Sequence, residues 1–324
     1  MFFLLFEKRL SNWLRSSLNG SKGLRPSIIV HGGAWDIPHE AHEAHKLGCA
    51  KAAEIGYELL VEGRSALDAV EAAVRSMEED TTFDAGVGSF LNRDGEVELD
   101  AMIMEGSSLR FGAVAAVQNI PHPISLARQV MEQTEHCMLV GEGARRFAES
   151  IGMKLVPTEA LLVGRERDRL DEIRKDKGFH ARQVFMEGIG KKGTVGAVAL
   201  DENGNIAAAT STGGTPNKLA GRVGDSPLVG CGNYADNRSA GVSASGYGES
   251  LMKTVIARRV CERVEAGMSI EGAAEDSIRY LGERVQGLGG VIALDNEGNP
   301  AFEHNTPHMA VSIIDRRGQR KTRI

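Results

Sequence analysis

The amino-acid sequence predicts an α+β fold in which antiparallel sheets and helices form layers. Three observations support this class: strand patterns occur in runs, tight turn sequences join them, and helical patterns follow in pairs. The clearest hairpin pairs residues 195–200 with residues 206–210 through the turn Asp201-Glu-Asn-Gly204. With 324 residues, the chain can hold one large domain or two modest ones.

The N-terminal half begins with a β-branched strand at residues 27–30, which runs into His31-Gly-Gly-Ala-Trp35. A long helical pattern covers about residues 40–60 and ends at Gly63, as a glycine C-cap predicts. A second helix begins at Ser65, because Asp68 follows at capping-box spacing. The remaining elements are expected in this order: a Gly-rich loop at 83–88, a hairpin around 92–95 that leads into 97–101, a strand at 113–117, and helices near 124–133 and 142–151.

A charged segment separates the two halves of the chain. Eleven of the thirteen residues from Arg165 to Lys177 are charged, and no apolar stripe crosses them. Such a segment is well solvated and has little reason to pack. We therefore expect a partly disordered linker over about residues 157–193.

The C-terminal half begins with the 195–206 hairpin and continues through a stretch rich in Gly, Asn and Asp. Two helices are expected at about 249–265 and 269–284, and then a last hairpin that starts at Gly290. The two hairpins resemble each other in sequence, but no fixed period recurs, so a repeat architecture is not indicated.

Composition limits the partners and the compartment. The net charge of −6 gives no global attraction to nucleic acid or to anionic membranes, so neither is expected as a partner. The four cysteines have no CxxC spacing, and we expect reduced, mostly buried thiols in a reducing compartment such as the cytoplasm.

The first 25 residues differ from the rest of the chain. Their apolar run, residues 2–6, is far too short to span a bilayer. The basic, acid-poor segment that follows fits an organelle transit peptide, a surface-seeking helix or an extension with no folded role. We favour the last interpretation, because the helical periodicity is brief.

Several familiar motifs are absent or incomplete. His39, His42 and His45 are spaced by three, whereas a zincin helix needs histidines at i and i+4, so a solvated helix face is the better interpretation. Gly86-x-Gly88 lacks the third glycine of a dinucleotide fingerprint. The sequence contains no P-loop and no Gly-x-Ser-x-Gly elbow.

Gly193-Thr194, directly before a strand pattern, indicates a different chemistry. A threonine hydroxyl needs a base, and an α-amino group with a pKa of about 7.7–8.0 is a suitable one. That amine exists only if the bond between Gly193 and Thr194 is cut. Glycine at 193 tolerates a strained backbone and leaves its carbonyl open to Thr194 Oγ1. This pair alone is a weak signal.

Longer motifs carry the specificity. Together they closely resemble the plant-type L-asparaginase/isoaspartyl peptidase family of N-terminal nucleophile (Ntn) hydrolases, over about residues 27–315. The matching segments are His31-Gly-Gly, Phe83-Asp-Ala-Gly, Gly95-Glu-Val-Glu-Leu-Asp-Ala, Gly193-Thr-Val-Gly-Ala-Val, Thr210-Ser-Thr-Gly-Gly, Gly221-Arg-Val-Gly-Asp-Ser-Pro, Ser243-Ala-Ser-Gly-Tyr-Gly-Glu and Gly287-Leu-Gly-Gly.

The resemblance implies a four-layer αββα sandwich formed by a single domain, residues 26–324. It also implies self-cleavage into an α chain, 1–193, and a β chain, 194–324, which stay together and pair as a dimer of heterodimers. No cofactor is implied for catalysis. The expected substrates are L-asparagine and β-aspartyl dipeptides.

Site roles follow from the same resemblance. Thr194 would be nucleophile and base, and Thr212 would hydrogen-bond its hydroxyl. Arg222 would bind the substrate α-carboxylate and Asp225 the α-ammonium, with Gly246 and Gly248 lining the pocket.

Two positions depart from the family pattern. Ser245 stands for a threonine that forms the oxyanion hole with Gly246, so the hole should persist with poorer preorganisation. Family members often have Asn at the position of Asp84, which leaves the role of Asp84 in doubt. The loop around it is implied to bind sodium through the backbone carbonyls of Met77, Glu78, Asp80, Phe83, Ala85 and Val87.

Two other functions remain open. A glycosylasparaginase-like amidase shares the Gly221–Pro227 stretch, but a secretory peptide and disulfides are not evident. A non-processed binding protein on the same scaffold would retain Thr194, Thr212, Arg222 and Asp225 for no chemistry.

Overall fold

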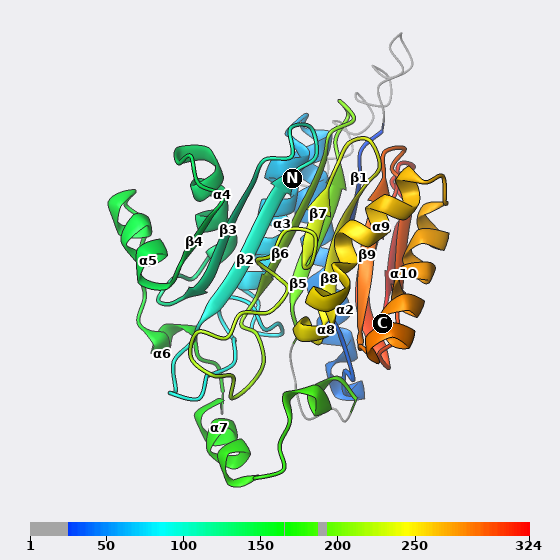
Figure 1. Cartoon of the computed structure of the whole chain (residues 1–324). Helices are drawn as coiled ribbons and strands as arrows, with labels where there is room; N and C mark the ends of the chain where they lie inside the picture. Colours follow the sequence, from blue (N-terminus) through cyan, green and yellow to red (C-terminus); the bar gives the residue numbers. More distant parts are fainter. Residues whose placement is uncertain (1–24, 165, 187–192) are drawn as a thin grey trace, which may run out of the picture.

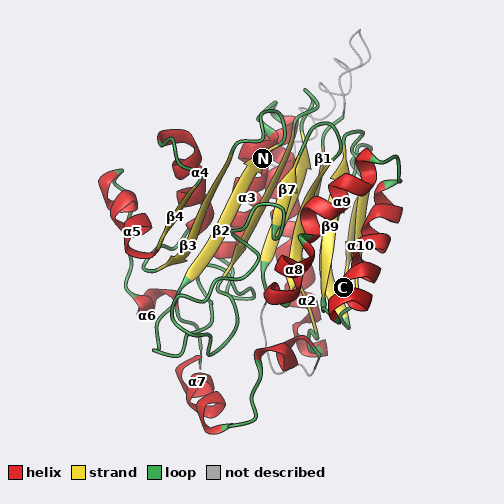
Figure 2. Cartoon of the chain, in the orientation of Figure 1, coloured by secondary structure: helices red, strands yellow, loops and turns green. Residues whose placement is uncertain are grey.

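The computed structural model describes residues 25–164, 166–186 and 193–324. The expectations for the N-terminal extension, apart from Arg25, and for the end of the charged linker therefore lie outside the described residues. In the described part, two stacked sheets are covered by helices on both outer faces (Figures 1 and 2). This arrangement confirms the predicted α+β class and its four layers.

The larger sheet has eight strands in the described chain, in the order β12-β11-β1-β5-β6-β2-β3-β4. Its strands pair antiparallel except for β3 and β4, which are parallel at one edge, so the sheet is predominantly antiparallel, as predicted. Its strands are β1 (Ser27–Trp35), β2 (Leu99–Glu105), β3 (Phe111–Val117), β4 (Met138–Val140), β5 (Val195–Leu200), β6 (Ile206–Thr212), β11 (His308–Ile314) and β12 (Arg320–Arg323).

The smaller sheet is antiparallel, in the order β10-β9-β8-β7. An apolar cluster that includes Ile29, Val198 and Ile292 lies between the two sheets. The two similar hairpins are therefore in different sheets, β5–β6 in the larger and β9–β10 in the smaller, and β5 contacts β9. The strands of the smaller sheet are β7 (Asn233–Ala235), β8 (Ala240–Gly246), β9 (Gly289–Asp295) and β10 (Pro300–His304).

Helices cover the outer faces of both sheets. Alanine and valine dominate the core under the first helices, which pack on the larger sheet, while α9 and α10 pack on the smaller one. Ser65 caps α3 by accepting a hydrogen bond from Asp68 N–H at 3.1 Å, as its spacing predicts. The helices are η1 (His39–Ala41), α2 (His42–Val61), α3 (Ala66–Glu78), α4 (Pro123–Gln133), α5 (Gly141–Ser150), α6 (Thr158–Leu161), α7 (Glu166–Lys175), η2 (Ala181–Phe185), α8 (Gly248–Thr254), α9 (Ile256–Glu265) and α10 (Ile270–Val285). None of these helices is long and apolar enough to cross a bilayer.

The charged segment forms more structure than its composition predicts. It contains α6, α7 and η2, and Leu170 and Ile173 on α7 are buried. Leu170 packs with Leu91, Leu99 and Leu161. Two apolar residues three positions apart are enough to anchor one helical turn, so the expectation that this segment does not pack is wrong for its described part.

Two other expectations are corrected. The helix expected at 249–265 is interrupted at Val255, whose left-handed backbone (φ +47°) separates α8 from α9. His45 is buried and is not part of a solvated face: its Nδ1 lies 2.9 Å from Ala41 O, and its ring contacts Phe83. No group of three or more His, Cys, Asp or Glu side chains in the described residues could hold a metal ion.

Candidate active site

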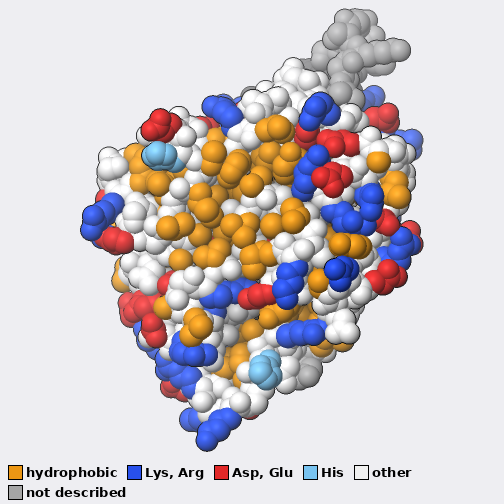
Figure 3. Space-filling view, viewed as in Figure 1, with side chains coloured by type: hydrophobic (Ala, Val, Ile, Leu, Met, Phe, Trp, Pro, Cys, Tyr) orange, Lys and Arg blue, Asp and Glu red, His pale blue; other side chains and the backbone are white. Residues whose placement is uncertain are grey.

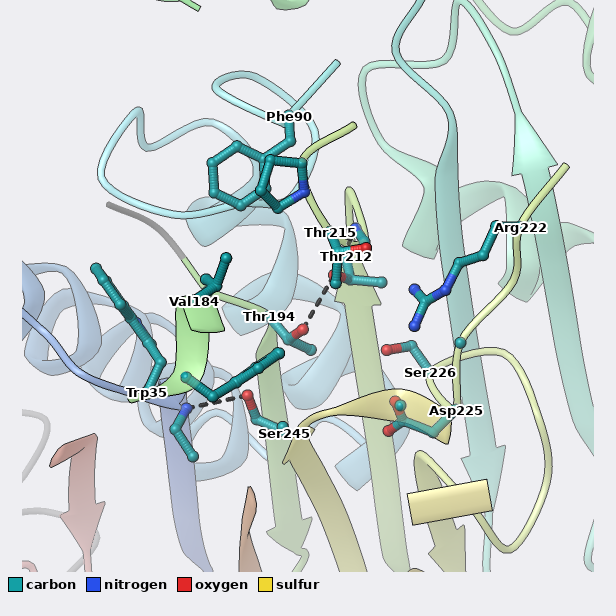
Figure 4. Close-up of a pocket in the computed structure, with 18 residues that line it drawn as sticks. Trp35, Phe90, Val184, Thr194, Thr212, Thr215, Arg222, Asp225, Ser226 and Ser245 are labelled. Carbon is teal, nitrogen blue, oxygen red and sulfur yellow. Dashed lines mark hydrogen bonds between the residues drawn. The ribbon is translucent and has the colours of Figure 1, made fainter. Parts of the chain in front are cut away.

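Thr194 lies immediately before β5, near the middle of the larger sheet (Figure 4). The antiparallel pairing of β5 with β6 sets Val195 opposite Ser211 and brings the end of β6 beside Thr194. Thr194 Oγ1 lies 3.0 Å from Thr212 Oγ1, within hydrogen-bond distance. The structure therefore brings together the predicted nucleophile and the threonine expected to bond it.

Gly193 is held by two backbone contacts. Its carbonyl oxygen accepts a hydrogen bond from Asp84 N–H at 3.0 Å. On its other side lies Gly33, where a Cβ would come within 2.9 Å of Gly193 Cα and where φ is +102°. The His31-Gly-Gly segment thus needs glycine at 33 for close approach to the bond before Thr194.

Ser245 and Gly246 end β8 on the neighbouring sheet. Ser245 Oγ accepts a hydrogen bond from Ala34 N–H at 3.0 Å, which orients the hydroxyl although serine lacks the methyl of threonine. Gly246 has φ +151°, and a Cβ there would overlap the backbone of Leu288 and Gly289. Both predicted oxyanion-hole residues line the same cavity as Thr194.

The predicted substrate-binding charges lie on one side of that cavity (Figure 4). Asp225 is buried, and its Oδ2 has no hydrogen-bond partner among the described residues. Burial raises the pKa of Asp225 to about 7. A buried carboxylate with an open oxygen is suited to bind a cationic group.

Arg222 already has a partner that the sequence analysis missed. Its Nε donates to Glu249 Oε1 at 3.0 Å and its Nη2 to Glu249 Oε2 at 2.9 Å. Glu249 follows Gly248 at the start of α8, and the exposed fraction of its side chain is 36%. The acidic residue directly after the Gly246-Tyr-Gly248 segment was the available signal, since a partly buried arginine favours a nearby counter-charge.

A buried polar chain lies beneath Thr194 and joins the two sheets. His31 Nε2 lies 2.9 Å from Ser243 Oγ, which in turn lies 2.7 Å from Thr210 Oγ1. Burial lowers the pKa of His31 to about 3, so its ring is neutral at pH 7. Gly196 makes room for this chain, because a Cβ there would overlap both Ser243 Oγ and His31 Nε2. The sequence analysis gave these residues no role.

The cavity beside Thr194 is small in the continuous chain. Its volume is about 30 Å³, which is room for about two water molecules. Trp35 and Val184 lie on the side opposite the charged residues (Figure 4), and Phe185, which follows Val184 in η2, also lines the cavity. A substrate larger than water therefore requires some of these groups, or Gly193, to move.

Backbone hydrogen bonds within the loop implied to bind sodium already use several of its carbonyl oxygens. Glu78 O accepts Val87 N–H at 2.8 Å, Met77 O accepts Asp80 N–H at 3.2 Å, and Asp80 O accepts Phe83 N–H at 3.1 Å. Each carbonyl oxygen has a second lone pair, so these bonds still allow a hard cation to be bound. The residues present therefore fit a carbonyl-bound ion.

Three features together define the class of Ntn hydrolases. They are the stacked sheets, a threonine immediately before a central strand, and the hydrogen-bonded carbonyl of the residue that precedes this threonine. Comparison with known proteins specifies the family: the asparaginase family profile matches residues 24–324, and the chain belongs to that family. This confirms the resemblance deduced from the sequence motifs.

Three relatives illustrate the extent of the similarity. The isoaspartyl peptidase/L-asparaginase of Danio rerio is 47% identical over 285 residues, which are 88% of this chain and 91% of the relative. The protein of the same name in Homo sapiens is 48% identical over 277 residues, 85% and 89% of the two chains. A probable isoaspartyl peptidase/L-asparaginase of Drosophila pseudoobscura pseudoobscura is 40% identical over 303 residues, 90% and 93% of the two chains.

Proposed function

We propose that this chain hydrolyses β-aspartyl (isoaspartyl) dipeptides and L-asparagine to L-aspartate, after cutting itself between Gly193 and Thr194. The observation that carries the proposal is the 3.0 Å approach of Thr194 Oγ1 to Thr212 Oγ1, beside a pocket that holds Arg222 and Asp225. The names of the relatives point to the same substrates.

Self-cleavage uses the contacts of the continuous chain. Thr194 Oγ1 attacks the Gly193 carbonyl carbon while Asp84 N–H, 3.0 Å from the carbonyl oxygen, stabilises the developing negative charge. The C–N bond breaks, the Thr194 nitrogen gains a proton, and Gly193 is transferred to an ester on Thr194. The Thr194 amine is free from this point; water then hydrolyses the ester, which releases the Gly193 carboxylate and the Thr194 hydroxyl.

Hydrolysis of substrate repeats this sequence on an external amide. The Thr194 amine takes the proton from its own hydroxyl as Oγ1 attacks the β-carbonyl, and later gives it to the leaving amine. The Ser245 hydroxyl and Gly246 N–H stabilise the oxyanion, and water hydrolyses the aspartyl ester. The Thr212 hydroxyl keeps Thr194 Oγ1 in place.

The charged pocket fixes which bond is cut. Asp225 binds the α-ammonium, and Arg222 binds the α-carboxylate through its Nη1/Nη2 end, because Glu249 occupies the Nε–Nη2 edge. With both α-groups held, the carbonyl that reaches Thr194 is the β one. Gly248 keeps this pocket open, since a Cβ there would come within 3.0 Å of Arg222 Nη2 and Asp225 Oδ1.

Two experiments test the proposal. Purified protein should separate on a denaturing gel into chains 1–193 and 194–324, whereas Thr194→Ala should stay intact and inactive. Steady-state assays should show kcat/KM for β-Asp-Leu above that for L-asparagine, with α-Asp-Leu inert because it lacks the free α-carboxylate.

The same experiments separate the alternatives. An intact, inactive wild-type chain would favour the binding protein, and preference for a glycosylated asparagine would favour the glycosylasparaginase-like amidase. Turnover of α-Asp-Leu as fast as its β isomer would overturn the assigned pocket.

We also propose the assembly and the ion implied by the family. A broad hydrophobic area covers the part of the surface where β2, β3 and β4 lie (Figure 3), and Val140, which ends β4, is 57% exposed. Such an area is typical of an interface, which supports a dimer of heterodimers; light scattering should give twice the 34.8 kDa of one chain. Sodium bound by the carbonyls of the 77–87 loop would fix the position of the loop that carries Asp84. A melting temperature that does not depend on sodium at constant ionic strength would argue against it.

We propose a cytoplasmic location from the oxidation state of the cysteines. All four are free thiols; Cys49, Cys231 and Cys261 are buried and Cys137 is exposed. Free thiols suit a reducing compartment. Imaging of the full chain, with and without residues 1–25, would show whether the N-terminal segment directs it elsewhere.

A further inference from the structure

Trp35 has a polar group that the proposed mechanism does not use. This residue ends β1, lines the cavity beside Thr194 and is 1% exposed. Its indole Nε1 is buried and finds no hydrogen-bond partner in residues 25–164, 166–186 or 193–324. Buried indole N–H groups are normally bonded, so an open donor in a substrate cavity points to a ligand.

The open N–H faces Gly193. A Cβ placed on Gly193 would lie 2.9 Å from both Cδ1 and Nε1 of the indole, so the ring presents this edge to the Gly193 backbone. His45 supports the ring, with 5.8 Å between the ring centroids. Figure 4 shows Trp35 on the side of Thr194 opposite Arg222 and Asp225.

Geometry relates this position to the leaving group of the substrate, if the proposed function holds. The leaving amine takes its proton from the Thr194 amine, so it must come within hydrogen-bond distance of that nitrogen. In the continuous chain the same nitrogen is bonded to Gly193. The leaving group therefore occupies the region that Gly193 fills before cleavage, next to the indole edge.

We propose that Trp35 is a specificity-determining residue that donates its indole N–H to the carboxylate of the leaving amino acid in a β-aspartyl dipeptide. L-Asparagine releases ammonia, which carries no carboxylate to accept this bond. The donor therefore favours dipeptides over asparagine without any contact to the aspartyl head, which Arg222 and Asp225 bind.

The experiment compares three substrates on the self-cleaved enzyme: β-Asp-Leu, β-aspartyl 3-methylbutylamide, which has the leucine side chain but no carboxylate, and L-asparagine. Trp35→Phe removes the N–H and keeps an aromatic ring. The matched control is Tyr234→Phe, which removes a polar atom from a ring in β7, outside the cavity.

We expect wild type to prefer β-Asp-Leu over the alkylamide by about 10- to 100-fold in kcat/KM, the range of a hydrogen bond to a charged group. Trp35→Phe should abolish this preference, mainly through a higher KM for β-Asp-Leu. Its kcat/KM for the alkylamide and for asparagine should stay within about twofold of wild type, as should all three values for Tyr234→Phe.

Two results would overturn the assignment: equal loss on all three substrates, which indicates a structural role, or an unchanged value for β-Asp-Leu. Melting temperature and a denaturing gel show whether Trp35→Phe folds and self-cleaves. If it does not, the comparison of substrates on the wild-type enzyme decides. Equal wild-type rates for β-Asp-Leu and the alkylamide would then overturn the assignment. Failure of the proposed function differs from both, because wild type would then hydrolyse none of the three.

Discussion

The pKa of Asp225 predicts an unusually steep loss of activity in acid. Burial is the largest cause that raises it to about 7; the charges of Glu249 and Asp100 also raise it, and Arg222 opposes them. Asp225 must be ionised to bind the substrate ammonium, so the productive form of the free enzyme is lost as pH falls through 7. At pH 6 only about one molecule in eleven would keep the carboxylate ionised.

A second group titrates in the same range. The Thr194 amine must be neutral to act as base, and an ordinary α-amino group has a pKa of about 7.7–8.0. Because both groups must be deprotonated, kcat/KM should fall about 100-fold per pH unit below pH 6.5, whereas one group gives tenfold. The plot of log kcat/KM against pH should therefore approach a slope of two on its acid side.

Stopped-assay rates for β-Asp-Leu from pH 5 to 9, at constant ionic strength, measure this slope. Glu249→Gln removes a negative charge that raises the pKa of Asp225, so one of the two inflections should move to lower pH. Glu262→Gln, which removes an exposed charge on α9, is the control and should leave the profile unchanged. A slope of one in wild type would refute the assignment of Asp225 as an ionised ligand with a raised pKa.

Three further predictions concern single residues. Arg222→Ala should lower kcat/KM by about 100- to 1000-fold while the gel still shows self-cleavage; normal asparagine hydrolysis would mean that the α-carboxylate binds elsewhere. Ser245→Ala should lower kcat by about 100-fold, and Ser245→Thr should retain activity; equal rates for both variants would remove the hydroxyl from the oxyanion hole. Gly196→Ala should destabilise the fold by about 1–3 kcal/mol, since its Cβ would overlap His31 and Ser243, and an unchanged melting temperature would contradict this packing.

The sequence predicts the elements whose signals are local. The hairpin through Asp201–Gly204 and the start of α3 at Ser65 depend on neighbouring residues, and both occur as expected. Strand β7 was missed because it has three residues within a Gly-rich stretch, so only its pairing with β8 defines it. The break between α8 and α9 at Val255 was missed because a β-branched residue gives no local sign of a left-handed backbone.

The candidate site likewise contains residues that local sequence motifs predict and contacts that they do not. Thr194, Thr212, Arg222 and Asp225 could be predicted because each lies in a motif that resembles the family's. The bond from Arg222 to Glu249 joins residues 27 positions apart, and the contact of His31 with Ser243 joins residues 212 positions apart, across the two sheets. The motifs that contain Arg222 and His31 do not contain the residues they contact, so only the tertiary structure reveals these two contacts.

Close contact between the two sheets also explains why glycines surround Thr194. The bond between Gly193 and Thr194 lies where β1 and β5 of the larger sheet meet β8 of the smaller one, and neighbouring backbone or side-chain atoms fill the space that a Cβ would need at the glycines there. Gly33 meets Gly193 Cα on one side, and Gly196 leaves room for the His31–Ser243 contact on the other. A side chain at either position would push the strands apart and move Thr194 Oγ1 away from its target carbonyl. In the proposed mechanism self-cleavage and substrate hydrolysis use the same oxygen, so variants at Gly33 or Gly196 should lose both reactions together.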